Sequence, residues 1–116
     1  MAGLSAEAVA AFERGNHLQQ AGKLEAAVAA YDAALALVPG HVHALGNRAV
    51  ALKRLGKFEA ALAGFDAAIA VAPEFFEAHF NRANLLRDWR HFADALASIE
   101  RAIALRPDSG EAHGSR

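Results

Sequence analysis

The chain has 116 residues, 54% of them hydrophobic, which is enough for one domain with a core of its own. Its 12 basic and 13 acidic side chains leave a net charge of -1, so we expect no broad attraction to nucleic acid or to an anionic membrane. Cysteine is absent, which excludes disulfides and thiolate metal sites. Neither a secretory signal nor a membrane-spanning run is recognisable, and we expect a single cytoplasmic domain over residues 1–116.

The first predicted elements are two helices, at 8–21 and 24–37. Ala27 and Tyr31 belong to a set of apolar residues spaced three and four apart, as in an amphipathic helix. Gly22 lies between the two helices, where a left-handed helix end needs a residue without Cβ. The sequence therefore predicts a helical hairpin.

Two further helical pairs are expected at the same spacing. Their predicted ranges are 42–55 and 58–71, followed by 76–89 and 92–105. Gly56 ends the first helix of the second pair, but Arg90 occupies this place in the third. Because a side chain is strained in the left-handed conformation, we expect the third turn to be more strained or differently shaped.

A repeat of 34 residues runs through these pairs, marked by Pro39, Pro73 and Pro107. The motif Ala-x-x-x-aromatic begins at Ala27 and again at Ala61. In the third copy, an isoleucine replaces the aromatic residue. The prolines follow the second helix of each pair, where a missing N–H does least harm.

With this spacing, residues 8–109 resemble the tetratricopeptide repeat family. The resemblance implies an all-α fold of antiparallel helical hairpins stacked as a right-handed superhelix. Its three repeats would be 8–41, 42–75 and 76–109. Residues 110–116 keep the register, so we expect them to begin a further repeat and the chain to be the N-terminal piece of a longer protein.

We expect apolar residues at the end of the stack to be exposed, because no complete fourth repeat follows to cover them. Leu96, Ile99 and Ile103 are expected to be partly exposed there, because each repeat buries its apolar face only against a neighbour. Such exposure would favour self-association through this uncapped C-terminal repeat.

The resemblance also implies that the first helices line a concave groove that binds a peptide. A side-chain amide can both donate and accept, so asparagines in this groove could pair with a peptide backbone of any sequence. The candidate peptide-binding residues are Phe12, Asn16, Asn47, Lys53, Arg54, Phe80, Asn81, Asn84 and Arg87.

Two family patterns bear on these residues. The amides resemble the asparagine ladder in the repeat arms of the O-linked N-acetylglucosamine transferases. Glu13, however, interrupts one column, that is, one position of the repeat compared across its three copies. Other members clamp a chaperone's C-terminal carboxylate with basic residues and two asparagines. Asn16 and Asn47 match those asparagines, but the basic places hold Phe12, Glu77 and Asn81, so the charge complementarity is missing.

Arginine recurs in one column, at Arg14, Arg48 and Arg82. We expect a structural role for it, in which each guanidinium pairs with a carboxylate across the stack. Trp89 would be a binding hot spot if it were exposed.

No catalytic pattern is present. The six histidines lack the His-Glu-x-x-His spacing, no serine lies in a Gly-x-Ser-x-Gly turn, and no glycine-rich phosphate loop occurs. We therefore expect no enzyme activity, no cofactor and no metal. The leading hypothesis is a protein-protein interaction module. The alternatives are a substrate-recruiting arm of a larger enzyme, such as a glycosyltransferase, and an oligomerisation unit.

Overall fold

The computed structural model describes residues 5–105, which form six helices and no strand. The helices are α1 (Ala6–Gln20), α2 (Leu24–Leu37), α3 (Val42–Arg54), α4 (Phe58–Val71), α5 (Phe76–Asp88) and α6 (Phe92–Leu105). The all-α prediction is therefore confirmed, and the bounds of α2, α4 and α6 are those expected. The first helix of each pair ends one residue earlier than expected, because the next residue is its C-cap.

The N-terminus of α1 begins two residues earlier than predicted because Ser5 caps it. The Oγ of Ser5 accepts a hydrogen bond from the backbone N–H of Ala8 at 3.1 Å. This bond satisfies one of the donors that a helix start leaves without an intrahelical partner.

The three tight turns inside the hairpins have one geometry. Gly22 and Gly56 have φ values of 81° and 83°, and Arg90 has a φ of 68°. In the third turn the N–H of His91 donates to the carbonyl of Leu86 at 2.7 Å, and the other two turns contain the equivalent bond. The third turn thus keeps the shape of the others and places a non-glycine residue in the left-handed region, which is strained.

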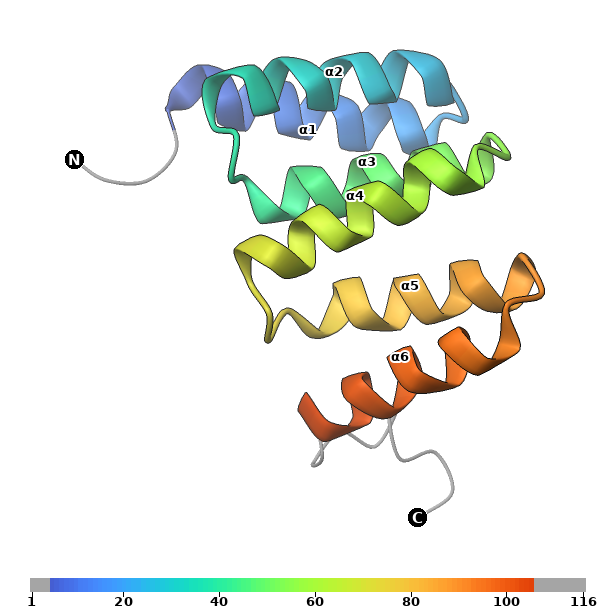
Figure 1. The fold of residues 1–116 in the computed structure, drawn as a ribbon. Helices are drawn as coiled ribbons and strands as arrows, with labels where there is room; N and C mark the ends of the chain where they lie inside the picture. Colours follow the sequence, from blue (N-terminus) through green and yellow to red (C-terminus); the bar gives the residue numbers. More distant parts are fainter. Residues whose placement is uncertain (1–4, 106–116) are drawn as a thin grey trace.

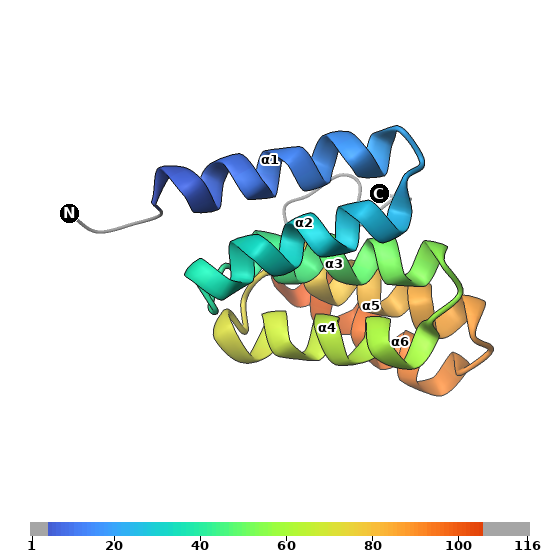
Figure 2. The same ribbon diagram turned by 90° about the horizontal axis from the view of Figure 1, so that it is seen from above.

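The helices pair into three hairpins that stack in chain order, with α1 at one end and α6 at the other (Figure 1). Figure 2, a view from above, shows all six helices running broadly along one direction or its reverse. Within residues 5–105, α3 contacts both α1 and α5, while α2, α4 and α6 make no contacts with one another. The stack is a helical repeat solenoid in which the first helices form the inner layer.

The core lies between the two helices of each hairpin and between hairpins. Tyr31 and Phe65 are fully buried, as predicted, whereas Ile99 of the last hairpin is only partly buried. Gly15 allows α1 to approach the ring of Tyr31, because a Cβ at Gly15 would lie 2.6 Å from Cε1 of that ring.

Arginines link successive hairpins through ion pairs, which confirms the structural role expected for two members of their column. Nε of Arg48 on α3 lies 2.6 Å from Oδ1 of Asp32 on α2. Nε of Arg82 on α5 lies 2.7 Å from Oδ1 of Asp66 on α4. Both pairs are partly exposed, so each contributes at most about 1 kcal/mol, but they recur at the same place in the stack.

Apolar side chains remain exposed at the last hairpin. Leu96 is 57% exposed and Phe92 is 59% exposed, and Ile99 and Ile103 are partly buried, as the sequence predicted. The expected start of a further repeat, at 110–116, lies outside the described residues. Among residues 5–105, no helix is long and apolar enough to cross a membrane.

Candidate functional site

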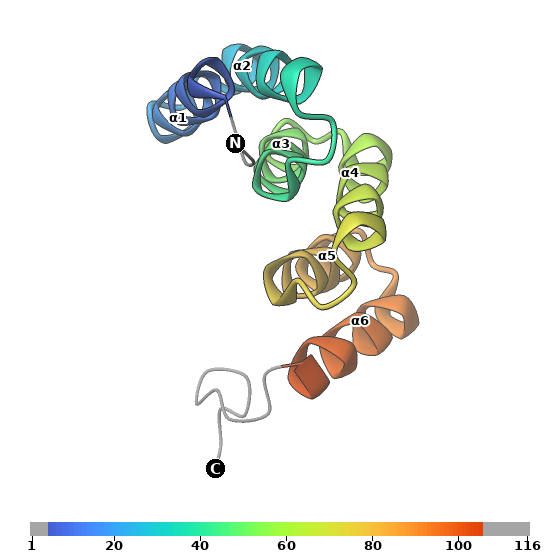
Figure 3. The same ribbon diagram turned by 90° about the vertical axis from the view of Figure 1, so that its left-hand side faces the viewer.

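The inner side of the solenoid is lined by α1, α3 and α5. Viewed nearly along the helices, in Figure 3, these three lie on the inside of an arc and α2, α4 and α6 on its outside. Contacts of α3 with both α1 and α5 bring the three helices into one continuous surface. The family resemblance predicts that the candidate peptide-binding residues lie on this inner surface.

The amide side chains are concentrated on the three inner helices. The sequence contains four asparagines and two glutamines, and all six belong to α1, α3 or α5. They are Asn16, Gln19, Gln20, Asn47, Asn81 and Asn84. The outer helices α2, α4 and α6 consist mainly of alanine, larger apolar residues and charged residues, so the two layers differ in chemistry and not only in position.

A hollow of about 360 Å³ separates α1 from α3 on the inner face. It is lined by polar residues of both helices and by one valine. The lining residues are Asn16, Gln19, Gln20, Asn47, Val50 and Arg54. Of the nine residues predicted from the sequence, the structure thus brings three together here: Asn16, Asn47 and Arg54.

Two asparagines in this hollow are linked to each other and to the core. Oδ1 of Asn16 accepts hydrogen bonds from the hydroxyl of Tyr31 at 2.6 Å and from Nδ2 of Asn47 at 2.9 Å. Nε2 of Gln19 donates to the same hydroxyl at 3.1 Å and to the backbone carbonyl of Asn47 at 3.3 Å. Burial raises the pKa of Tyr31, whereas its hydrogen bond from Gln19 works in the other direction. The amides therefore join two hairpins as well as lining the hollow.

Part of the hydrogen-bonding capacity in the hollow remains unused. Within residues 5–105, Oδ1 of Asn47 and Nδ2 of Asn16 have no hydrogen-bond partner. A guanidinium nitrogen of Arg54 donates to the backbone carbonyl of Gln19 at 3.2 Å, and this side chain is exposed. Within residues 5–105, amide acceptors, amide donors and one cation in this hollow are thus available to a ligand.

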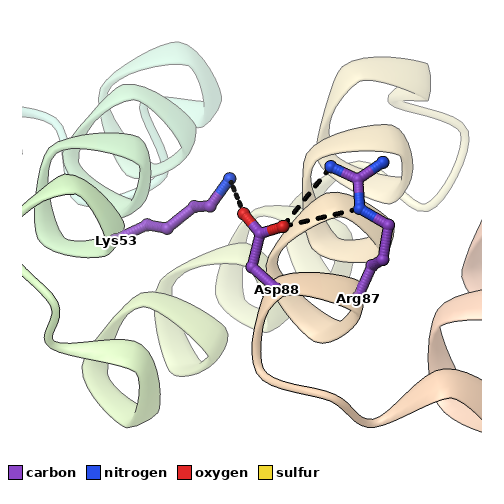
Figure 4. A network of polar contacts seen from close by, with 3 residues as sticks. All are labelled: Lys53, Arg87 and Asp88. Atoms are coloured by element: carbon purple, nitrogen blue, oxygen red, sulfur yellow. Dashed lines mark hydrogen bonds and ion pairs between the residues drawn. The ribbon is translucent and has the colours of Figure 1, made fainter.

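Lys53 and Arg87 share one carboxylate that the sequence-based set of binding residues omitted. Nζ of Lys53 lies 2.9 Å from Oδ2 of Asp88, and a guanidinium nitrogen of Arg87 lies 3.4 Å from Oδ1 (Figure 4). The hydrogen bond from Lys53 lowers the pKa of Asp88, so this carboxylate is ionised at neutral pH. Lys53, Arg87 and Asp88 together therefore carry a single net positive charge, which is less than the sequence alone suggests for the two basic residues.

A second hollow, of about 400 Å³, lies where α5 meets α6. Three predicted residues of α5 line it, Phe80, Asn84 and Arg87. The rest of the lining is apolar and comes mainly from α6, which sequence reasoning did not include in the site. These additional residues are Ala83, Phe92, Ala95, Leu96 and Ile99. Asn81 lines neither hollow, and within residues 5–105 the amides of Asn81 and Asn84 form no side-chain hydrogen bond.

Phe12 is partly buried at the end of the inner face where α3 begins. Its ring centroid lies 4.8 Å from that of His41 and 6.0 Å from that of Tyr31. His41 is itself 5% exposed and caps α3, because Nδ1 accepts the backbone N–H of Ala44 at 3.2 Å. Burial lowers the pKa of His41, and the neighbouring His43 lowers it further. Phe12 therefore has a packing role in addition to any contact with a ligand.

Trp89, the conditional hot spot, is partly buried at the end of α5. Its ring packs against His91 at 4.7 Å and Phe58 at 5.8 Å between centroids. The expectation of a hot spot depended on exposure, so packing accounts for this residue. In residues 5–105, no three acidic or histidine side chains are grouped in a way that could hold a metal ion.

Comparisons with known proteins agree with this architecture. The tetratricopeptide repeat model matches residues 12–68, 47–108 and 80–116. The first such domain of Spaghetti (RPAP3), bound to the HSP90 peptide SRMEEVD, has a TM-score of 0.87 and 26% identity over 96% of this chain and 89% of that chain. No curated protein sequence matches significantly.

Two further solved structures are similar to the same extent. The complex of the TPR2B domain of yeast Sti1 with pHsp70 has a TM-score of 0.87 and 27% identity, over 96% of this chain and 87% of that one. The first domain of human RPAP3 has the same score and identity, over 93% and 85% of the two chains. The repeat model spans most of the sequence, and the chain belongs to the tetratricopeptide repeat family.

Proposed function

We propose that this chain is a protein-protein interaction module that binds an extended peptide along α1, α3 and α5. The observation that carries the proposal is the distribution of its amides, all six of which belong to these three helices. A bound strand exposes one N–H and one C=O per residue, and a side-chain amide can satisfy either. The similar domains of Spaghetti and yeast Sti1, which are complexed with chaperone peptides, support a peptide as the ligand.

The ligand proposed here differs in chemistry from the acidic peptide SRMEEVD. The places that would hold basic side chains in a carboxylate clamp are occupied by Phe12, Glu77 and Asn81. Lys53 and Arg87 lie nearby, but Asp88 already neutralises one of their two charges. We infer that affinity comes mainly from backbone pairing to amides, with a modest preference for acidic residues near Arg54.

In this role the chain performs no chemical step of its own, and a cytoplasmic location is proposed with it. The same groove would serve if the chain were the recruiting arm of a larger enzyme, which is the second candidate. The asparagine column of Asn47 and Asn81 favours that reading, but Glu13 interrupts it. The two candidates differ in the sequence attached to this domain and make the same prediction for peptide binding.

The test is selection of binders from a random peptide display library, followed by calorimetric titration of the selected peptides. Asn81→Ala combined with Asn84→Ala removes amides that have no side-chain partner within residues 5–105, so the fold should be unaffected. We expect affinity to fall about tenfold or more, from the loss of two hydrogen bonds. Glu59→Ala, an exposed position on the outer helix α4, is the control and should bind as the wild type does.

Two results would reject the groove. One is the absence of any selected peptide, and the other is a double variant that is folded by circular dichroism and binds as tightly as Glu59→Ala. SRMEEVD is included as a separate probe. If it binds as tightly as the selected peptides, the amide-based specificity is wrong and a carboxylate clamp replaces it.

A further inference from the structure

Within the described residues, the end of the third hairpin exposes a surface that the other two hairpins bury. On α2 and α4 the equivalent surface is covered by the next first helix, α3 or α5, and Tyr31 and Phe65 there are fully buried. On α6 the same repeat position is Ile99, which is partly buried, and its neighbour Leu96 is 57% exposed. With part of α5 they form the hollow of about 400 Å³. This end face is thus shaped to receive a helix of the α3 and α5 kind.

Within residues 5–105, α1 is a further helix of that kind, and its corresponding face is uncovered. On α3 and α5, one row of residues faces the preceding hairpin and is buried or partly buried. The two rows are Ala44, Arg48 and Ala51 on α3, and Ala78, Arg82 and Leu85 on α5. At the same positions of the repeat, α1 has Ala10, Arg14 and His17, and all three are exposed.

The charges on the two uncovered faces are complementary at one position. The ion pairs of Arg48 with Asp32 and of Arg82 with Asp66 recur every 34 residues. One repeat before Arg48, the equivalent position holds Arg14 on α1. One repeat after Asp66, the equivalent position holds Glu100 on α6. Both side chains are exposed, and within residues 5–105 neither of them forms an ion pair.

We propose that copies of this chain associate head to tail, with α1 of one copy seated against α5 and α6 of the next and Arg14 paired with Glu100. The interface uses two different surfaces, so each added copy leaves one free end and the assembly grows with concentration. His17 stands where Ala51 and Leu85 are buried, so this contact is weaker than the one inside the chain. Association uses a hollow that includes the candidate peptide-binding residues Phe80, Asn84 and Arg87, and it extends the row of inner helices from one copy to the next.

The experiment is sedimentation velocity of the full chain over a wide concentration range, with charge reversal at each face. Arg14→Glu and Glu100→Arg each place like charges together, and each should weaken the association constant about tenfold. The double variant restores an opposite-charge pair in the reverse orientation, and its association should return toward the wild-type value. The positions are exposed, so circular dichroism should be unchanged in all three variants.

A control separates the pair from general charge effects. Glu74→Arg makes the same change as Glu100→Arg at an exposed loop position between α4 and α5, and it should associate as the wild type does. The proposal is overturned if the wild type stays monomeric at all concentrations, as it would if another segment covered the end face. It is also overturned if the double variant associates no better than the single ones.

Discussion

Oδ1 of Asn16 accepts a hydrogen bond from Nδ2 of Asn47 at 2.9 Å, which joins the first hairpin to the second through two side chains of the inner face. The same oxygen accepts from the hydroxyl of fully buried Tyr31. The amide that lines the candidate groove is therefore also a part of the fold, and we expect substitutions at Asn16 to change stability as well as the proposed peptide binding.

Asn16→Ala is expected to lower the free energy of unfolding by about 1–3 kcal/mol, because it leaves the hydroxyl of Tyr31 without an acceptor. Tyr31→Phe removes that hydroxyl while Asn16 still accepts from Asn47, and it should cost only about 1 kcal/mol. Urea unfolding followed by circular dichroism measures both values. If Asn16→Ala costs no more than Tyr31→Phe, the shared acceptor is not important for stability.

Gly15 and Gly46 are predicted to respond in opposite ways to alanine. A Cβ at Gly15 would lie 2.6 Å from the ring of Tyr31, so Gly15→Ala overpacks the first hairpin and should cost about 1–3 kcal/mol. A Cβ at Gly46 meets only Phe75, at 3.8 Å, which is an ordinary contact. Gly46→Ala should therefore stabilise α3 by about 0.5–1 kcal/mol through helix propensity.

Thermal unfolding of the two glycine variants, compared with the wild type, gives the sign of each effect. The packing explanation predicts a lower midpoint for Gly15→Ala and a higher one for Gly46→Ala. Equal shifts in the same direction would contradict it, since both residues lie inside helices and differ mainly in what surrounds them.

The strained turn at Arg90 offers a way to stabilise the chain. Its left-handed φ of 68° costs about 1–2 kcal/mol in a residue with a Cβ. Glycine avoids this strain, but it loses more conformational entropy on folding, which offsets part of the benefit. Arg90→Gly should therefore raise the free energy of unfolding by about 0.5–1 kcal/mol. Gly56→Ala is the reciprocal change and should lower it by about 1 kcal/mol, because no atom lies within 4 Å of the added Cβ and only the backbone is strained.

Urea unfolding followed by circular dichroism measures the free energy of unfolding of both turn variants. A loss of stability in Arg90→Gly would show that the arginine side chain contributes more than its backbone conformation costs.

The architecture was predictable because the repeat places each residue type in an equivalent environment. The recurrence of proline and glycine every 34 residues predicts where helices end, and the apolar spacing around Ala27 predicts which face of a helix is buried. The turn at Arg90 illustrates how strong this constraint is. Its hydrogen bonds match those of the glycine turns, so the repeat geometry prevails over the local preference of the residue.

The details of the candidate site were less predictable, because they depend on which side chains meet across helices. The sequence places Asn16 and Asn47 in the groove, but no spacing rule shows that Asn16 also accepts from a buried hydroxyl two helical turns into α2. Likewise, the sequence alone suggests two free cations at Lys53 and Arg87, whereas in the structure both pair with the carboxylate of Asp88. A signal for that carboxylate existed, since Asp88 follows Arg87 directly in the sequence.

His41 is predicted to make stability fall in mild acid. Its Nδ1 accepts the N–H of Ala44, so the ring must be neutral to cap α3, and burial lowers its pKa below the ordinary value of 6.5. The unfolded chain therefore takes up a proton at higher pH than the folded one does. The contribution is complete above the unfolded pKa and is lost as the pH falls through 6.5 toward the folded pKa.

His41→Asn isolates this contribution, because asparagine accepts the same capping hydrogen bond and does not titrate in this range. Urea unfolding of both proteins between about pH 8 and about pH 5 gives the pH dependence of each. The other histidines contribute equally to the two curves, so the wild type should lose more stability than the variant on acidification. Parallel curves would mean that protonated His41 is tolerated in the fold, and that its buried ring does not control the N-terminus of α3.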